Sequence, residues 1–290
     1  MIIDDSGSMS ASDGNKILGS GSTSKLVPCS RWSELSTSML FHAQLSEAAD
    51  VKTEFRLLNM AAPIMLGLGP ENDGVHLNQL EGYFNNSPGG RTPLCRHIKE
   101  VTEEIRAIEE TLRSNGQKAV IVIATDGESS DGDLITAMKP LQHLPVWVVI
   151  RLCTDEDAVV NYWNDIDGQL ELDIDVLDDF CAEATEVHEN NKWLTYGLPL
   201  QRLREFGTTL KEIDLLDESR LTSEQIRSMV SIILGGNKDS YPHPEVDMDG
   251  FEKAVQEKLS QEVQTWCPLK KRMMPWIRMN KIKSEKCSIM

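Results

Sequence analysis

Short apolar runs alternate along the chain with stretches in which apolar residues recur every three or four positions. The runs that predict strands are residues 2–3, 53–59, 61–68, 119–127, 146–152 and 170–177. Residues 119–127 (AVIVIATDG) and 146–152 (VWVVIRL) are continuous and rich in β-branched side chains, as in strands buried on both faces. Pro63 limits residues 61–68 to an edge strand, because proline cannot donate to a sheet ladder.

Helical spacing fills the intervals between these strands. The stretches that predict helices are residues 32–45, 93–113, 222–234 and 249–265. The clearest is 93–113, where six apolar residues fall on one face: Leu94, Ile98, Val101, Ile105, Ile108 and Leu112. Thr222 or Ser223 would cap the third helix, and Gly235-Gly236 would end it. This alternation predicts an α/β fold with a mostly parallel central sheet.

Two polar stretches separate predicted elements or follow them. Residues 10–30 are rich in serine and glycine, which predicts a long loop. Residues 241–247 (YPHPEVD) predict an extended segment. The acidic residues 164–169 (NDIDGQ) are similar to a calcium loop, but Trp163 and Ile174 occupy positions where an EF-hand needs acids. We therefore expect a solvated turn there.

Oxygen-bearing side chains follow two of the predicted strands and precede the clearest helix. They are Asp4, Ser6 and Ser8 after the first strand, Thr92 before the helix, and Asp126 after the buried strand 119–127. In open α/β sheets, ligands bind beyond the carboxyl ends of the strands. Carboxylate and hydroxyl oxygens are the ligands that Mg²⁺ prefers. The sequence therefore predicts a divalent-metal site at this edge of the sheet.

The run D-x-S-x-S, followed by a distant threonine and a distant aspartate, resembles the metal-ion-dependent adhesion site of von Willebrand factor A domains, relatives of integrin I domains. The resemblance implies a Rossmann-like, doubly wound sheet with helices on both faces. It implies that Ser6, Ser8 and Thr92 hold Mg²⁺ or Mn²⁺ through hydroxyls, while Asp4 and Asp126 act through water. It also implies an open coordination position, which an Asp or Glu of a protein partner fills.

Each piece of this pattern has a simpler structural explanation when taken alone. Thr92-Pro93 is a good pair for the start of a helix. Asp4 to Gly7 could form a plain turn, and so could Asp126-Gly127. The metal site is favoured because all the pieces occur in the right order, each at the junction of a strand and a helix.

Charge is distributed unevenly along the chain, whose net charge is −17. Residues 268–290 hold seven basic residues and one acidic residue, a net +6, so the other 267 residues carry −23. A body that acidic repels nucleic acid, and we expect no nucleic-acid partner. The six cysteines lie far apart with no C-x-x-C pair, which argues against a zinc site and a disulfide scaffold and favours an intracellular, cytoplasmic protein.

The chain ends in Cys287-Ser-Ile-Met290, which fits a C-a-a-X box for prenylation of Cys287. A single lipid chain binds membranes weakly, and a polybasic stretch is the usual second signal. The basic residues before Cys287 therefore predict anchoring at the cytoplasmic face of an anionic membrane. The alternative is a solvated basic tail that offsets an acidic body.

We expect three regions: a von Willebrand factor A domain at residues 1–195, a helical C-terminal appendage at 196–267 and a basic tail at 268–290. The function that the resemblance implies is metal-dependent protein binding, for adhesion or scaffolding, without catalysis. Two alternatives stay open. A Mg²⁺-dependent hydrolase could activate water for phosphoryl transfer, although no general base accompanies the motif. A structural scaffold could use the metal only to rigidify its loops.

Overall fold

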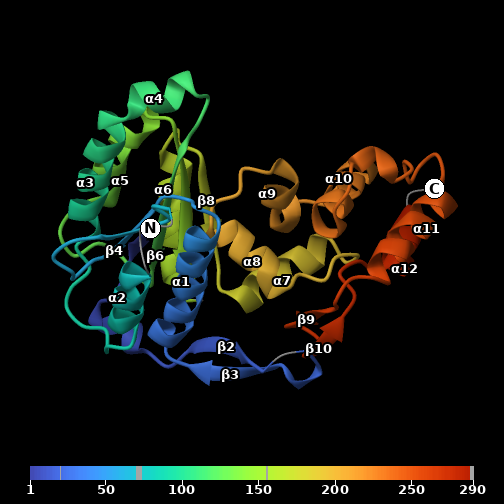
Figure 1. Cartoon of the computed structure of the whole chain (residues 1–290), viewed down its shortest axis with the longest axis horizontal. Helices are drawn as coiled ribbons and strands as arrows, with labels where there is room; N and C mark the ends of the chain where they lie inside the picture. Colours follow the sequence, from blue (N-terminus) through green and yellow to red (C-terminus); the bar gives the residue numbers. More distant parts are fainter. Residues whose placement is uncertain (20, 70–73, 155, 288–290) are drawn as a thin grey trace. The chain divides into compact units, whose positions relative to one another are not determined.

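The chain folds into two compact units, each described here by itself (Figure 1). The computed structural model describes residues 1–19, 21–69, 74–154 and 156–287, without the side chains of residues 285–287. The first, here called the sheet unit, comprises Met1–Lys16, Val27–Asp179 and Glu205–Gly207. The second, the helical unit, comprises Ile17–Leu26, Phe180–Arg204 and Thr208–Met290. Neither unit is a continuous piece of the sequence.

A six-stranded sheet forms the centre of the sheet unit, in the order β5-β4-β1-β6-β7-β8. Its strands are β1 (Ile2–Ile3), β4 (Thr53–Leu57), β5 (Ile64–Leu66), β6 (Ala119–Thr125), β7 (Val146–Leu152) and β8 (Ile174–Leu177). All neighbours are parallel except the edge strand β5, which is antiparallel to β4. The α/β class, the mostly parallel sheet and the edge strand after Pro63 are thus confirmed. Because Ile3 lies opposite Ala124, β1 and β6 end side by side.

Helices cover both faces of this sheet (Figure 1). Side chains of Ile121, Ile123 and Val148 point to one face and pack with α3, α5 and α6. Ile3 and Ala124 point to the other face, where the core includes α1 and α2. The bounds are α1 Arg31–Ala48, α2 Val75–Phe84, α3 Leu94–Ala107, α4 Glu109–Ser114, α5 Leu134–Met138, a 3-10 segment Lys139–His143, and α6 Asp157–Gln169. Each fully buried aliphatic side chain contributes roughly 1.5–3 kcal/mol to this packing.

Three predictions about helices were wrong. The predicted helix 249–265 is too long, because α11 (Met248–Leu259) ends six residues earlier. The stretch 93–113 is not one helix, because Ile108 N bonds to Ile105 O at 3.1 Å, one residue short of the α-helical partner. This tighter turn separates α3 from α4 and leaves Ile108 49% exposed. Residues 164–169 are no turn, because they complete α6. Ile166 is buried there one turn after Trp163, so the acidic residues occupy the outer face of a helix.

The predicted loop at residues 10–30 is also wrong, because it contains a hairpin of β2 (Gly14–Leu18) and β3 (Lys25–Cys29). The turn-forming residues are confined to its end, where Gly19 adopts a φ of +87° and a 3-10 turn spans Gly21–Thr23. Residues Ile17–Leu26 of this hairpin belong to the helical unit, where Trp266 Nε1 donates to Ser24 O at 3.1 Å.

The core of the helical unit contains the fully buried side chains of Trp193, Tyr241 and Phe251. Its elements are α7 Phe180–Asn190, α8 Leu198–Glu205, α9 Lys211–Glu218, α10 Ser223–Leu234, a 3-10 turn Lys238–Ser240, α11 Met248–Leu259, β9 Thr265–Cys267, β10 Arg272–Met274 and α12 Met279–Cys287. The predicted start of α10 is confirmed, because Thr222 and Gln225 form a reciprocal capping box. Residues 241–247 are not extended, since Val246 N bonds to His243 O in a turn.

The boundaries of the two compact units differ from the predicted boundaries at residues 195 and 267. The division falls after Asp179, and Glu205–Gly207 returns to the sheet unit. The basic residues 268–290 include β10 and α12, and Ile277 and Ile282 are buried in the core of the helical unit. The side chain of Cys287 and residues 288–290 lie outside the described residues. Within the part of the chain that the structure describes, no helix combines the length and apolar character that a membrane span requires.

Candidate metal centre

The structure brings four of the five predicted metal ligands into one hydrogen-bonded chain. Ser6 N donates to Asp4 Oδ1 at 2.9 Å, and the hydroxyls of Ser6 and Ser8 lie 3.0 Å apart. Ser8 Oγ donates to Asp126 Oδ1 at 2.9 Å. Adjacent strands account for this proximity, because Asp4 follows β1 and Asp126 follows β6. The carboxyl ends of two parallel strands thus place two carboxylates at one edge of the sheet.

A single 3-10 turn directs the two serines to the same side. It spans Gly7–Ser10 and is closed by a hydrogen bond from Met9 N to Ser6 O at 3.2 Å. Met9 is fully buried and anchors the turn in the core. Because the turn is tied at both ends, the positions of the Ser6 and Ser8 hydroxyls follow from the fold of the loop.

Thr92, the fifth predicted ligand, lies on a loop that backbone hydrogen bonds join to the first. Gly7 N donates to Gly90 O at 3.3 Å, and Gly89 N donates to Asp5 O at 2.7 Å. Gly90 has a φ of +105°, and a Cβ there would lie 2.4 Å from the Asn59 side chain, so glycine is required. Among the described residues, no hydrogen bond joins the Thr92 hydroxyl to the other four ligands.

Thr92 does not cap α3, so that simpler explanation of the residue is wrong. Asp131 accepts hydrogen bonds from the first free amides of this helix, those of Cys95 and Arg96, each at 3.0 Å. The backbone of Thr92 instead pairs with Ser130, whose N–H donates to Thr92 O at 2.8 Å. Backbone hydrogen bonds therefore join the loops that carry Ser8, Thr92 and Asp126 to one another. The Thr92 hydroxyl does not cap the helix.

Asp4 carries a buried carboxylate that is bonded only to neutral donors. Besides Ser6 N, its side chain accepts a hydrogen bond from Thr125 Oγ1 at 2.7 Å. Burial raises the pKa of Asp4, the hydrogen bonds from Ser6 and Thr125 oppose the shift, and the charge of Asp126 adds to it. No ion pair with Asp4 occurs among the described residues. Its ionised form therefore lacks the cation that would stabilise it.

Arg31, which the sequence did not point to, supplies a positive charge to Asp126. Its Nη1 donates to Asp126 Oδ2 at 3.0 Å, its Nε to Asp13 Oδ1 at 2.7 Å and its Nη2 to Glu156 Oε1 at 2.6 Å. Its side chain is 6% exposed, and the hydrogen bond with Asp13 raises its pKa against the effect of burial. Arg31 begins α1, 95 residues before Asp126, and no local pattern marks the pair.

The donor set fits a hard divalent cation. It offers carboxylates from Asp4 and Asp126 and hydroxyls from Ser6, Ser8 and Thr92, which are all oxygen ligands of the kind that Mg²⁺ and Mn²⁺ prefer. The buried Asp4 charge without a cationic partner is the observation that most favours a metal here. Arg31 neutralises only one side of Asp126, whose other oxygen faces Ser8.

A second group of carboxylates occurs in the helical unit, where Glu183, Glu186 and Asp217 could each offer one oxygen to a metal. Arg204, however, already donates to Glu183 Oε2 at 2.5 Å and to Asp217 Oδ2 at 2.9 Å. Because this guanidinium pairs with two of the three carboxylates, these two belong to a buried ion-pair network.

A third buried polar cluster, in the sheet unit, centres on Glu205. His42 Nε2 lies 3.1 Å from Glu205 Oε2, and Arg151 Nε lies 3.3 Å from Oε1. Ser38 donates to the same carboxylate, and Arg151 also pairs with Glu34 at 2.6 Å. Burial opposes ionisation, but the hydrogen bond with His42 and the charge of Arg151 lower the pKa of Glu205 to about 2.

Comparison with known proteins gives no match. No family model matches the chain, and no curated protein matches it either. The candidate metal centre therefore rests on its own residues: two carboxylates at adjacent strand ends, joined through two serine hydroxyls, with a threonine on the neighbouring loop.

Proposed function

We propose that the sheet unit is a von Willebrand factor A-type domain with a Rossmann-like, doubly wound sheet, and that it binds a protein partner through a metal-ion-dependent adhesion site. The observation that carries the proposal is Asp4, a buried carboxylate with neutral donors only, linked through Ser6 and Ser8 to Asp126. A bound Mg²⁺ or Mn²⁺ would supply an open coordination position for a partner's Asp or Glu. Thr92 would serve as the remaining hydroxyl ligand.

The residues of the chain have distinct tasks in this proposal. Ser6 and Ser8 contribute neutral oxygens, so the ion keeps much of its positive charge and its attraction for an outside carboxylate. Arg31 fixes the orientation of Asp126 through the bond at 3.0 Å. The hydrogen bond from Gly7 N to Gly90 O joins the loop of Thr92 to the loop of the two serines.

A hydrolase is the less supported alternative. Phosphoryl transfer needs a cation that grips the transferred group or a base that activates water. Arg31 is the arginine in contact with the motif, and it is engaged with three carboxylates. Assay of generic phosphate esters in Mg²⁺ would separate the two functions, since the binding module should release no phosphate.

Titration calorimetry of the full chain with Mg²⁺ and Mn²⁺ tests the proposal. Asp126→Ala should weaken binding by about tenfold or more, because it removes a charged ligand. Asp165→Ala is the matched control, since it removes an exposed carboxylate from α6 and should leave the affinity unchanged. Equal affinities in all three proteins would refute the metal site.

The partner's chemistry is tested with acetate as a carboxylate probe. The Mn²⁺-loaded chain should bind acetate, which electron paramagnetic resonance of the ion reports, and both EDTA and Thr92→Ala should weaken this binding. A partner that binds equally well with and without EDTA would contradict the role of the metal while leaving the metal site itself intact.

We also propose that prenylation of Cys287 anchors the chain to a membrane. The support is the C-a-a-X-like end after a segment of net charge +6. Mass spectrometry of the C-terminal peptide from a host with farnesyltransferase tests the chemistry. Cys287→Ser should move the chain to the soluble fraction, whereas Cys181→Ser should not. An unmodified tail ending in Met290 would rule the anchor out.

A further inference from the structure

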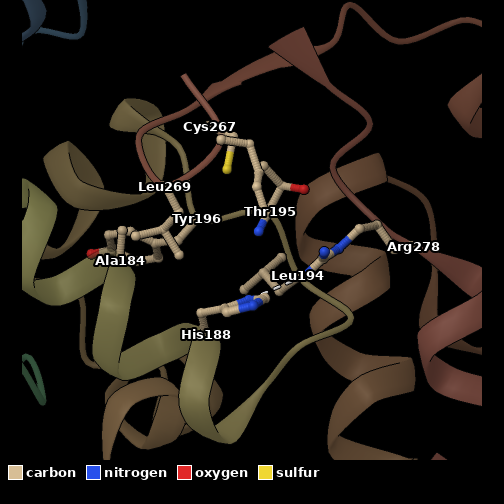
Figure 2. Close-up of a pocket in the computed structure, with 9 residues that line it drawn as sticks. Ala184, His188, Leu194, Thr195, Tyr196, Cys267, Leu269 and Arg278 are labelled. Atoms are coloured by element: carbon tan, nitrogen blue, oxygen red, sulfur yellow. Dashed lines mark hydrogen bonds between the residues drawn. The ribbon is translucent and has the colours of Figure 1, made fainter. Parts of the chain in front are cut away.

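A small cavity lies within the helical unit, between α7 and the basic C-terminal segment (Figure 2). Its volume is about 10 Å³, which is enough for one water-sized atom. Nine residues line it, and among them three are basic and none is acidic. The basic residues are His188 on α7, Lys270 after β9, and Arg278 before α12. In a chain with a net charge of −17, such a lining is unexpected.

Arg278 lies directly against His188. Figure 2 shows the two side chains meeting beneath Leu194, and Arg278 Nη2 lies 3.2 Å from His188 Nδ1. The same guanidinium donates to the carbonyl of Lys192, which holds it in place. The neutral imidazole can accept this hydrogen bond, whereas a protonated imidazole would be repelled by the guanidinium unless an anion lay beside the pair.

The charges of further basic residues act on His188. Burial, followed by the charges of Arg278, Lys270, Lys192 and Lys281, lowers the pKa of His188. Within the described residues, Lys192, Lys270 and Lys281 form no ion pair with a carboxylate. This concentration of positive charge is maintained by folded structure, because Ile277 and Ile282 fix the segment that carries Arg278 and Lys281 in the core.

We propose that this cavity is a phosphate-binding site, in which one oxygen of a phosphate group enters the cavity beside His188 while Arg278 and Lys270 balance its charge. A phosphate suits the site better than a carboxylate, because two cations, Arg278 and Lys270, line the cavity and a phosphate monoester carries close to two negative charges at neutral pH. The site is separate from the metal centre and does not depend on the proposed function.

The folded state of the basic segment agrees with the proposal. A solvated tail would spread its charges in water, whereas here Arg278 contacts His188 and lines the cavity together with Lys270. The phosphate could belong to a soluble phosphate ester or to a lipid headgroup, and both share the same recognition chemistry.

Nuclear magnetic resonance of the His188 ring in the full chain provides the test, with inorganic phosphate as the probe at constant ionic strength. Bound phosphate should raise the pKa of His188, because an adjacent anion stabilises the imidazolium. An unchanged His188 titration at phosphate concentrations up to tens of millimolar would overturn the proposal.

Matched lysine variants separate a built site from general attraction. Lys270→Gln should weaken phosphate binding about fivefold, since it removes one cation near the ligand. Lys271→Gln makes the same charge change at the neighbouring exposed position, which does not line the cavity, and should leave the affinity unchanged. Equal losses in both variants would show non-specific attraction and overturn the proposal.

Vesicles identify the source of the phosphate. Vesicles that contain a phosphoinositide are compared with vesicles that contain only phosphatidylserine as the anionic lipid. Preference for the phosphoinositide, lost in Lys270→Gln, assigns the site to a lipid headgroup. Binding of inorganic phosphate without that preference assigns it to soluble phosphate esters. Asp126→Ala should alter neither result, so failure of the metal site would not be mistaken for failure of this one.

Discussion

Asp4 and Glu205 are both buried carboxylates of the sheet unit, yet their pKa values shift in opposite directions. Glu205 contacts His42 and Arg151, and its pKa falls to about 2. Asp4 contacts a backbone amide and the hydroxyl of Thr125, and its pKa rises. Burial disfavours the charge in both. The difference lies in the partner, which is cationic in one case and neutral in the other.

This contrast separates a structural carboxylate from a functional one. The protein itself compensates the charge of Glu205, so this residue needs nothing from outside and stabilises the fold. The charge of Asp4 is left without a cation at the edge of the sheet, where ligands bind in open α/β sheets. Carboxylates with such perturbed pKa values mark candidate sites when geometry supports them.

The largest expected effect on stability comes from removing the charge of Glu205. Glu205→Gln should lower the free energy of unfolding by about 4 kcal/mol at neutral pH, because it leaves the buried Arg151 without one of its carboxylates. Urea-induced unfolding measures the loss. Glu103→Gln, which breaks an exposed pair with Arg106, should cost less than about 1 kcal/mol. Similar losses in the two variants would contradict the structural role of Glu205.

Acid should remove most of the stability difference between wild type and Glu205→Gln. The folded pKa of Glu205, about 2, lies below its ordinary value of 4.5, so its stabilisation is fully present above pH 4.5 and is lost as the pH falls toward 2. The stabilities of wild type and Glu205→Gln should therefore converge over that interval by about 3 kcal/mol. A constant gap down to pH 2 would show that the hydrogen bonds matter and the charge does not.

Removing the charge of Asp4 should have a smaller effect on stability than removing that of Glu205, and it should stabilise the metal-free chain. Because the folded pKa of Asp4 lies above 3.8, its ionised form costs stability at neutral pH, and the cost disappears below that value. Asp4→Asn should raise the midpoint of thermal unfolding of the metal-free chain, whereas Asp126→Asn, which loses its pair with Arg31, should lower it. A lower unfolding midpoint for Asp4→Asn than for wild type would contradict the view that the charge of Asp4 is uncompensated.

Strands buried on both faces could be predicted from sequence, and several half-exposed elements could not. The runs that form β6 and β7 are continuous and β-branched, so no other element competes for them. The hairpin of β2 and β3 is mostly polar and partly exposed, and its apolar residues show no regular alternation. Helix α2 buries only Leu80 and Phe84, too few to reveal a helical period.

The residues of the candidate metal centre also divide into those that could be predicted from sequence and those that could not. Asp4, Ser6 and Ser8 could be predicted because they form one short motif, and strand order brings Asp126 beside them. Arg31 could not, because it meets Asp126 only through the tertiary fold. For Glu205 a partial signal exists: Arg151 interrupts an apolar run, and a charge in a buried strand requires a partner. Its position in the sequence, 54 residues later, gives no sign of the pairing.

The return of Glu205–Gly207 to the sheet unit constrains the order of folding during synthesis. A nascent chain that ends at Asp179 already contains all six strands of the sheet. In that chain, His42 lacks its carboxylate partner and Arg151 lacks one of its two, so the sheet unit cannot reach its full stability. Domains usually fold from the N-terminus as they emerge. Here the first unit is completed only after α7 and α8 have been made, and translation couples the folding of the two units.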